Sequence, residues 1–176
     1  MQLRLTRKLI SALLLGHCLL LAHAHASDAE QGLNSAEQAR YLRELKQLYL
    51  TQDERQALLA HSNDLLKTYA LRAGYQVGQA QRQDLLYQLR VGAPGELLLR
   101  EEIRGQNGTD IAVRNQRIEL FGADPFIRYE CSQSGIDCVL HNPVDDSPLL
   151  SIVRDHQGAA ELAKALSFLI RNLQKG

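Results

Sequence analysis

The short connections in the second half of the chain constrain its fold more than any other feature. Between Glu96 and Val153, strand-like segments are separated only by turn sequences. Two parallel strands need a crossover of a dozen or more residues, usually a helix, whereas two antiparallel strands can be joined by a few residues. No connection here is long enough for a crossover helix. The sequence therefore predicts an antiparallel meander.

Two cysteines in this half predict a cross-link within the meander. Cys131 and Cys138 enclose six residues that are rich in turn formers, with Gly135 near the middle. Because strand-like sequence flanks both cysteines, we expect them to face each other at the base of a β-hairpin. A disulfide there stabilises the fold by roughly 2–3 kcal/mol in the chain-entropy description. Catalytic dithiols usually have the C-x-x-C spacing at a helix start, so we favour a structural disulfide over a redox-active pair.

The segment before the meander has an ambiguous pattern. In residues 79–91, Leu85 and Tyr87 belong to an alternating series that suits a strand, yet the same residues could extend a helix. The sequence Gly92–Gly95 forces a turn, and Glu96 follows at hairpin distance. We therefore favour strand, turn and strand.

Two features of the later strands concern register. Asn107-Gly108 is typical of tight hairpin turns, and we interpret it so although Thr109 completes an N-glycosylation sequon. Ile111 and Val113 occupy odd positions, whereas Ile118 occupies an even one. A strand with one buried face cannot change parity without an extra residue. We therefore expect a bulge or turn near Arg114 to Gln116.

Charged residues on these strands have two interpretations. The segments Arg100-Glu101-Glu102 and Arg114 to Arg117 are most simply the solvated face or edge of the sheet. A charged edge can also bind a partner, but solvated charges are the commoner case.

Helical patterns flank the strands. Ser35–Gln38 and Thr51–Glu54 both have the form of a capping box and precede apolar residues at helical spacing. An apolar stripe after Gly158 predicts a C-terminal helix that covers the sheet. Helices, consecutive strands and a last helix predict a single α+β domain over residues 27–176. Residues 27–34 are polar, and we expect a mobile entry segment there.

The first 26 residues predict export. Three basic residues precede an apolar run from Leu9 to Ala22, which is followed by two Ala-x-Ala sites that end at Ala24 and Ala26. This pattern is typical of a cleaved secretory signal peptide, residues 1–24 or 1–26. The run is shorter than the roughly 20 residues of a membrane-spanning helix. Leu15–Cys18 loosely resembles a lipoprotein box but lacks a small residue before the cysteine. We expect a periplasmic or secreted protein.

The charge balance excludes one class of partner. Three of the 20 Lys and Arg residues lie in the leader and all 20 Asp and Glu residues lie after it, which leaves a net charge of −3. Such a chain has no basic field for nucleic acid. No second apolar segment is long enough to cross a bilayer, so we expect no transmembrane anchor in the mature chain.

Five polar residues are the nearest approach to a catalytic or metal-binding group. They lie within 16 residues of one another: His141, Asp145, Asp146, Asp155 and His156. Their spacing matches no metal-ligand pattern, and we favour turn roles for Asp145 and Asp146 and a helix N-cap role for Asp155. His61, on a predicted helix, is expected at the surface. We predict no catalytic residue, metal or cofactor.

Tyrosines of the first half are the best candidates for an interaction surface. Tyr41, Tyr49 and Tyr69 lie on the predicted helices, and tyrosine is favoured at recognition surfaces. At helical spacing, Tyr41 and Tyr49 also suit the margin of a core.

Three functions from different classes follow. We favour a non-enzymatic binding protein whose partner is another envelope or secreted protein. The alternative is a carrier of a small hydrophobic ligand, which needs a cavity lined by Leu59, Leu66, Leu166 and Ile170. The third is a hydrolase-type enzyme that uses His141, His156 and nearby Asp residues, which requires these side chains to converge.

Overall fold

The computed structural model describes residues 35–105 and 110–176. The predicted signal peptide, the entry segment 27–34 and the Asn107-Gly108 turn lie outside the described residues. The elements follow the order α1 (Ser35–Leu48), α2 (Glu54–Thr68), η1 (Ala73–Tyr75), β1 (Gln83–Val91), β2 (Glu96–Gly105), β3 (Ile111–Glu119), β4 (Tyr129–Cys131), β5 (Asp137–His141), β6 (Pro148–Val153) and α3 (His156–Leu173). The described residues thus form three α-helices and two antiparallel sheets, and the predicted α+β class is confirmed.

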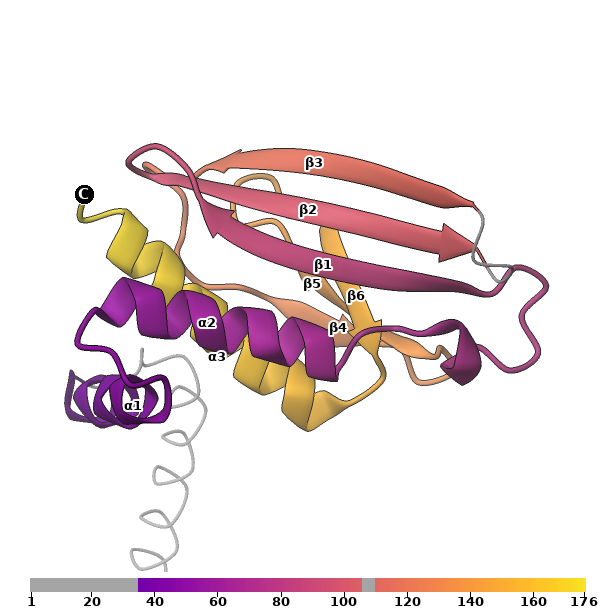
Figure 1. Cartoon of the computed structure of the whole chain (residues 1–176), viewed down its shortest axis with the longest axis horizontal. Helices are drawn as coiled ribbons and strands as arrows, with labels where there is room; N and C mark the ends of the chain where they lie inside the picture. The colour runs from indigo at the N-terminus through magenta and orange to yellow at the C-terminus, as the bar shows by residue number, and fades with distance from the viewer. Residues whose placement is uncertain (1–34, 106–109) are drawn as a thin grey trace, which may run out of the picture. The chain divides into compact units, whose positions relative to one another are not determined.

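Each sheet consists of three consecutive strands. The first has the order β1-β2-β3 and the second the order β4-β5-β6 (Figure 1). Every neighbouring pair is antiparallel, as the short connections require. The segment with the ambiguous pattern is strand β1, which begins at Gln83 and pairs with β2 along its whole length.

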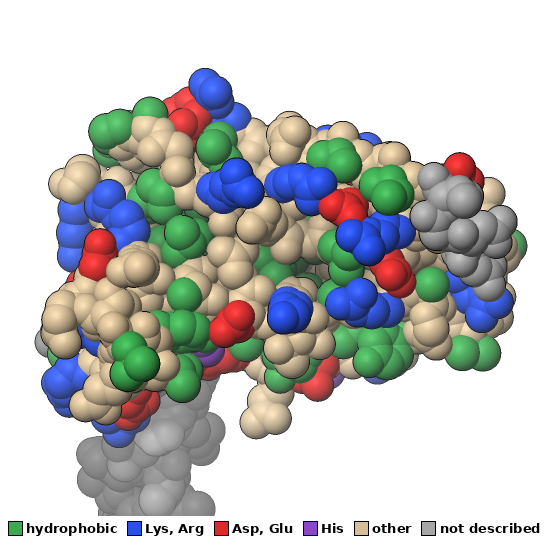
Figure 2. All heavy atoms as spheres, in the orientation of Figure 1, with side chains coloured by type: hydrophobic (Ala, Val, Ile, Leu, Met, Phe, Trp, Pro, Cys, Tyr) green, Lys and Arg blue, Asp and Glu red, His purple; other side chains and the backbone are tan. Residues whose placement is uncertain are grey.

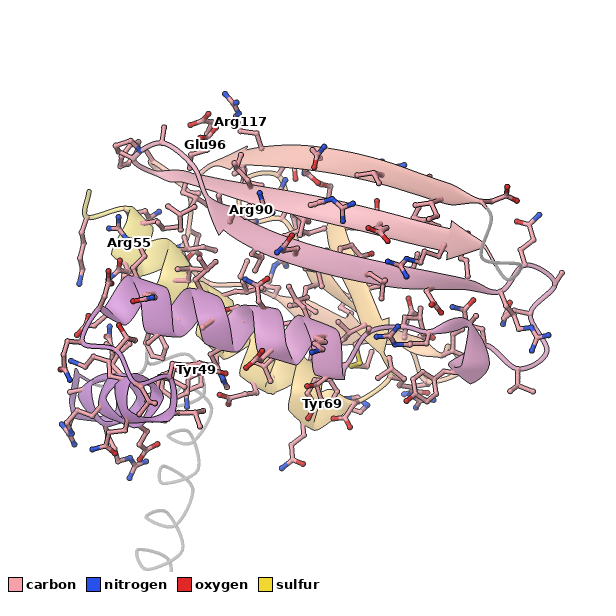
Figure 3. All side chains as sticks on the ribbon, in the orientation of Figure 1. Tyr49, Arg55, Tyr69, Arg90, Glu96 and Arg117 are labelled. Carbon is pink, nitrogen blue, oxygen red and sulfur yellow. A yellow bond between two sulfur atoms is a disulfide. The ribbon has the colours of Figure 1, made fainter. Side chains whose placement is uncertain are left out.

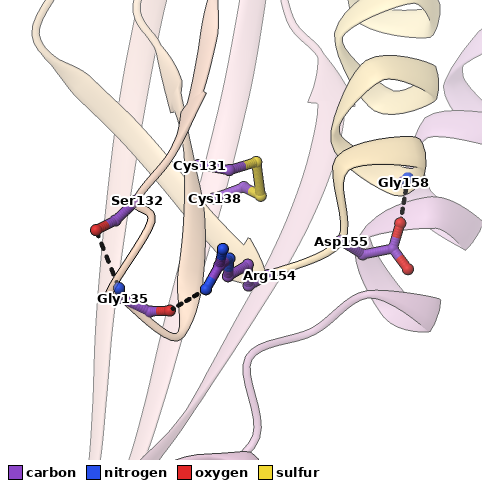
Figure 4. Close-up of a disulfide and its surroundings, with 7 residues drawn as sticks. All are labelled: Cys131, Ser132, Gly135, Cys138, Arg154, Asp155 and Gly158. Atoms are coloured by element: carbon purple, nitrogen blue, oxygen red, sulfur yellow. Dashed lines mark hydrogen bonds between the residues drawn. A yellow bond between two sulfur atoms is a disulfide. The ribbon is translucent and has the colours of Figure 1, made fainter.

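The predicted disulfide is present at the end of the β4–β5 ladder. Cys131 lies directly opposite Cys138, and their Sγ atoms are bonded (Figure 4). The loop that they enclose is held by its own side chains and by the strand beside it. The Gly135 N–H donates to Ser132 Oγ over 3.0 Å, and Arg154 donates to the Gly135 carbonyl over 3.5 Å.

The expected bulge in β3 is absent, and that prediction is wrong. β3 pairs with β2 in one unbroken register, from Ile111 opposite Arg104 to Glu119 opposite Glu96. The parity changes for another reason. Ile111 and Val113 are 56% and 48% exposed. These two apolar residues simply lie on the solvent face, whereas even-numbered Ile118 is buried.

The core lies against α3. This helix begins after Asp155, whose side chain accepts a hydrogen bond from the Gly158 N–H over 2.7 Å. Eleven of the α3 residues are buried, including Leu162 and Phe168. The helix contacts α2 on one side and β4 and β5 on the other, so the predicted packing of the C-terminal helix on a sheet is confirmed. None of the helices in residues 35–105 and 110–176 has the length and apolar character needed to span a bilayer.

The close contact between Gly158 and Tyr69 gives a testable prediction. A Cβ at position 158 would lie 2.6 Å from an atom of the Tyr69 ring, so that Gly158→Ala must displace the ring or the start of α3. We expect a loss of about 1–2 kcal/mol in the free energy of unfolding, measured by urea titration. Gly74→Ala, where nothing lies within 4 Å, is the control. If Tyr69→Ala does not relieve the loss in the double variant, the steric explanation fails.

Candidate functional site

The three aspartates among the five polar residues around the β5–β6 loop take the turn and cap roles that we favoured. Asp155 is the N-cap of α3. Asp145 accepts hydrogen bonds from the N–H and the hydroxyl of Ser147, and these bonds hold the pKa of Asp145 below its usual value. Asp146 forms an ion pair with Arg128.

The histidines of this group lie at opposite ends of strand β6. His141 lies before the strand, with Nδ1 3.0 Å from the Asp146 carbonyl oxygen, and His156 is the first residue of α3 behind it. Six residues of extended chain span roughly 20 Å. Among the described residues, no three His, Cys, Asp or Glu side chains are placed to share a metal ion. The five polar residues therefore do not converge: some lie at the β5–β6 loop and the others at the start of α3.

Two of the three candidate tyrosines belong to a polar network between the helices. Tyr41 is only 8% exposed, and its hydroxyl donates to Glu161 Oε1 over 2.7 Å. Burial raises the pKa of Tyr41 above its usual range. Tyr49 donates to Asp64 over 2.9 Å, and its hydroxyl oxygen lies 3.2 Å from His61 Nδ1. Burial, followed by the bond to Asp64, raises the pKa of Tyr49 to about 12.

His61 completes this network, so the prediction that it lies at the surface is wrong. Its side chain is 14% exposed, and Nε2 lies 3.2 Å from Glu161 Oε1. An ionised carboxylate only accepts, so Nε2 is the donor. Tyr69 is the C-cap of α2 and packs against Gly158 instead. An interaction surface at these three tyrosines stays a prediction.

Three of the four residues predicted to line a ligand cavity are part of the packed core. Leu66, Leu166 and Ile170 are at most 1% exposed. Leu59, on α2, is half-buried. The cleft described below is lined instead by residues of the first sheet and of β6.

The backbone of β1 has hydrogen-bond partners on its outer side at several positions. The Gly92 N–H donates to the Glu96 carbonyl at the end of the β1–β2 ladder. Because backbone groups alternate between the two sides of an antiparallel strand, even-numbered residues of β1 face β2 and odd-numbered ones face away. Helix α2 lies along this outer side (Figure 1).

Three partners bond to outward groups of β1, at Gln83, Leu85 and Leu89. The side-chain amide of Gln76 bonds to both the N–H and the carbonyl of Gln83. The Leu85 N–H donates to the Leu71 carbonyl over 2.9 Å. The side-chain amide of Asn63, on α2, accepts from the Leu89 N–H over 2.8 Å and donates to the Leu89 carbonyl over 3.1 Å. Asn63 thus imitates one residue of a neighbouring strand.

The outer side of β6 is closed in a similar way. Ile152 forms a bridge with Ala70, and the Val153 N–H donates to the Tyr69 carbonyl. The Ser151 N–H donates to the Tyr87 hydroxyl over 3.3 Å. Residues 69–70, which follow α2, therefore cover the outer side of β6 near its end at Val153.

The outer side of β3 has no such cover. Gly105 N–H donates to the Asp110 carbonyl, and Leu120 N–H donates to the Gly95 carbonyl, at the two ends of the β2–β3 ladder. By the same alternation, the even-numbered residues of β3 face β2 and the odd-numbered ones face away. In the part of the chain that the structure describes, no group bonds to the outward N–H and C=O of Ile111–Glu119. We call these backbone groups and the side chains beside them the β3 edge.

The side chains of the β3 edge combine apolar and cationic groups. Ile111 and Val113 are exposed on the outer face of the sheet. The side chains of Arg114 and Arg117 are 76% and 69% exposed, on opposite faces. Figure 2 shows the outer face, where Lys and Arg side chains are spread over the sheet among hydrophobic ones. Arg117 lies beside Glu96, and Arg90 lies on β1, as Figure 3 shows.

A cleft opens on the inner face of the same sheet. This face is buried at one end, at Leu97 and Ile118, but it is partly exposed at the other. There the sheet and the start of β6 enclose a cleft of about 310 Å³, which we call the inner cleft; its lining includes Leu85, Tyr87, Glu101, Ile103, Arg114 and Ser151.

A chain of polar contacts crosses the inner cleft. The Tyr87 hydroxyl, which accepts from the Ser151 N–H, donates to Glu101 Oε1 over 3.1 Å. Glu101 Oε2 lies 3.4 Å from Arg114 Nη1. Burial raises the pKa of Tyr87 above its usual range, so this hydroxyl keeps its proton and remains a donor. The contacts fix Arg114 at the rim of the cleft.

The sequence contained two signals for the β3 edge. The charges of Arg114 and Arg117 indicated a solvated edge or a partner-binding surface. The odd positions of Ile111 and Val113 were the second clue, but we attributed them to a bulge. No family model, curated protein or solved structure matches this chain. The function must therefore be inferred from this geometry.

Asn63 gives a prediction about the closed edge. Asn63→Ala leaves the N–H and C=O of Leu89 without partners, and we expect a loss of about 1–3 kcal/mol in the free energy of unfolding. Asn63→Asp keeps the acceptor but loses the donor, so its loss should be smaller. Gln88→Ala, at an exposed position of the same strand, is the control in urea titrations. Equal stability of Asn63→Ala and wild type would contradict the capping role.

Glu161 gives a prediction about pH. The bond from His61, and then that from Tyr41, hold the pKa of Glu161 below its usual value. Its stabilising contribution is therefore complete above the unfolded pKa of about 4.3 and is lost as the pH falls through the lower folded value. We expect the difference in urea midpoint between wild type and Glu161→Gln to be largest above pH ~5 and to shrink toward pH ~3.

The matched control for this experiment is Glu44→Gln. Glu44 forms an exposed pair with Arg40 on α1, and such pairs contribute little. Its variant should follow wild type at every pH. A constant offset between wild type and Glu161→Gln across the acid range would show that the network does not depend on the ionised carboxylate.

Proposed function

We propose that this protein is an exported, non-enzymatic binding protein that takes up an extended segment of another envelope or secreted protein along the β3 edge. The observation that carries the proposal is the contrast between the strand edges. β1 and β6 have backbone partners on their outer sides, supplied by Asn63, Leu71 and the chain after α2. β3 has none among the described residues. A partner strand can supply them, as in β-strand addition.

The length and composition of β3 support this function. Nine residues in extended form reach about 30 Å, a long edge for a small protein. Native proteins usually shorten, twist or cover such an edge, because free N–H and C=O groups pair with other chains. Ile111 and Val113 add apolar surface on the outer face beside these groups. A bound segment would gain backbone hydrogen bonds and side-chain contacts together.

Two observations support export. The leader pattern of residues 1–26 is typical of a signal peptide. The Cys131–Cys138 disulfide is compatible with an oxidising compartment, where structural disulfides persist. A segment presented by a neighbouring envelope or secreted protein is the ligand that such a location would supply.

Amide hydrogen exchange tests the proposed edge directly. In the free protein, we expect the odd-numbered amides of Val113, Asn115 and Arg117 to exchange faster than the even-numbered amides that bond to β2. A peptide selected from a displayed random library on the immobilised protein should protect the odd-numbered amides. Nuclear magnetic resonance resolves them residue by residue. Binding that leaves these amides unprotected would refute strand addition.

Asn115→Pro is the matching variant. Asn115 is odd-numbered, so proline removes an outward N–H and leaves the ladder with β2 intact; proline is tolerated at such edge positions. We expect at least about tenfold weaker peptide binding, since one hydrogen bond is lost and the ring obstructs the strand. Asn115→Ala removes the side chain alone and should bind as wild type does. Equal affinities for Asn115→Pro and Asn115→Ala would count against the proposal.

A further inference from the structure

Resting on the proposed function, we propose that the segment bound at the β3 edge is acidic, with two carboxylates three residues apart that bind Arg114 and Arg117. Two apolar residues of the same segment pack against Ile111 and Val113. The ligand class is thus an extended acidic and apolar stretch of a protein chain. Four side chains of one strand define it.

The spacing follows from the alternation of the strand. Arg114 and Arg117 are three positions apart and lie on opposite faces of the sheet. The residues of a partner strand that lie opposite them are also three apart and also point to opposite faces. One carboxylate therefore reaches Arg114 at the rim of the inner cleft, and the other reaches Arg117 on the outer face.

The Arg114 side chain is oriented by Glu101 and remains accessible to a carboxylate of the bound segment. Its Nη1 lies 3.4 Å from Glu101 Oε2, and Glu101 is itself held by the Tyr87 hydroxyl. A guanidinium has five N–H donors in a planar fork. One carboxylate cannot use all five donors, and the Arg114 side chain is 76% exposed, so a second carboxylate can bind in the bidentate geometry that arginine favours.

Arg117 is held in a comparable way. Its Nε lies 2.5 Å from Oε1 of Glu96, whose carboxylate is nearly buried and accepts from the Ala93 N–H over 2.7 Å. The anchor holds one side of the guanidinium while the rest stays exposed. Because the side chain is already ordered, less conformational entropy is lost on binding.

The ends of the strand fix the register. Asp110 and Glu119 are exposed at the two ends of β3 and repel carboxylates placed opposite them. Antiparallel pairing is the more stable and the commoner kind. In that direction the segment has carboxylates at its first and fourth positions, opposite Arg117 and Arg114. Apolar residues occupy its fifth and seventh positions, opposite Val113 and Ile111.

The probe is a capped peptide with the sequence Asp-Thr-Thr-Asp-Val-Thr-Val, labelled for fluorescence polarisation. Its matched partner has Asn in place of both Asp residues. We expect each carboxylate to increase the affinity for the full mature protein about fivefold at low salt. The gain should shrink as salt is added, because exposed charges are screened.

Two variants assign each carboxylate to its arginine. Arg114→Gln should lose the preference for Asp at the fourth position of the peptide and keep the preference at the first; Arg117→Gln should do the reverse. Arg90→Gln is the control. It removes the same charge from the same sheet, on exposed Arg90 of β1, two strands away from β3 (Figure 3).

The outcomes separate this inference from the proposed function. If both peptides bind equally and Asn115→Pro weakens both, the β3 edge accepts strands but the acidic preference is overturned. The acidic preference is also overturned if Arg90→Gln weakens binding as much as Arg114→Gln does. If neither peptide binds and library-selected peptides leave the odd-numbered amides unprotected, both proposals fail. A doubled mass in solution that Asn115→Pro restores to a monomer would assign the edge to a second copy, and would overturn both.

Discussion

The backbone hydrogen bonds at the strand edges are the constraint on which this structure depends. Each three-stranded sheet leaves outward N–H and C=O groups on its first and last strands, and these groups need partners. Helix α2 and the chain after it supply partners for two of these four strands, β1 and β6: Asn63 bonds to Leu89, Leu71 bonds to Leu85, and Tyr69 bonds to Val153. The same segment thus closes the edges of β1 and β6. Its position beside β1 also determines which edge of the first sheet stays uncovered.

That position leaves β3 as the far strand of its sheet. Because the three strands follow one another in the chain, β2 separates β3 from α2. The cover of the inner face varies along the strands as well, since on β2 this face is buried at Leu97 and partly exposed at Ile103. An uncovered edge and a half-covered face therefore occur on one strand. Arg114, at the rim of the inner cleft, belongs to both.

The sequence predicts the fold well but the site only in part. Turn residues and short connections are local signals, so they indicate the antiparallel strands, the Cys131–Cys138 hairpin and the C-terminal helix. The hydrogen bonds that cover a strand edge, in contrast, can join residues that are far apart in the sequence. The bond between Asn63 and Leu89 joins residues 26 positions apart, and nothing near either residue indicates it. The same limit applies to His61, whose partner Glu161 lies on α3. The odd and even positions of the apolar residues in β3 led to the wrong prediction of a bulge, because that inference assumes that every apolar residue of a strand faces the core.

The cations of β3 have two physical effects that act together. Arg114 and Arg117 make the edge a poor template for a second copy of itself, because paired β3 strands bring two guanidiniums to the same face of the sheet, on each of its two faces. The same charges favour a strand that carries carboxylates at matching positions. The side chains of Arg114 and Arg117 then discriminate between a second copy of β3 and an acidic partner strand. The unpaired backbone groups can bond to either strand. An edge with Ile111 and Val113 alone would lack that discrimination. On this argument, the arginines restrict which strand pairs with β3, and the open backbone makes the pairing possible.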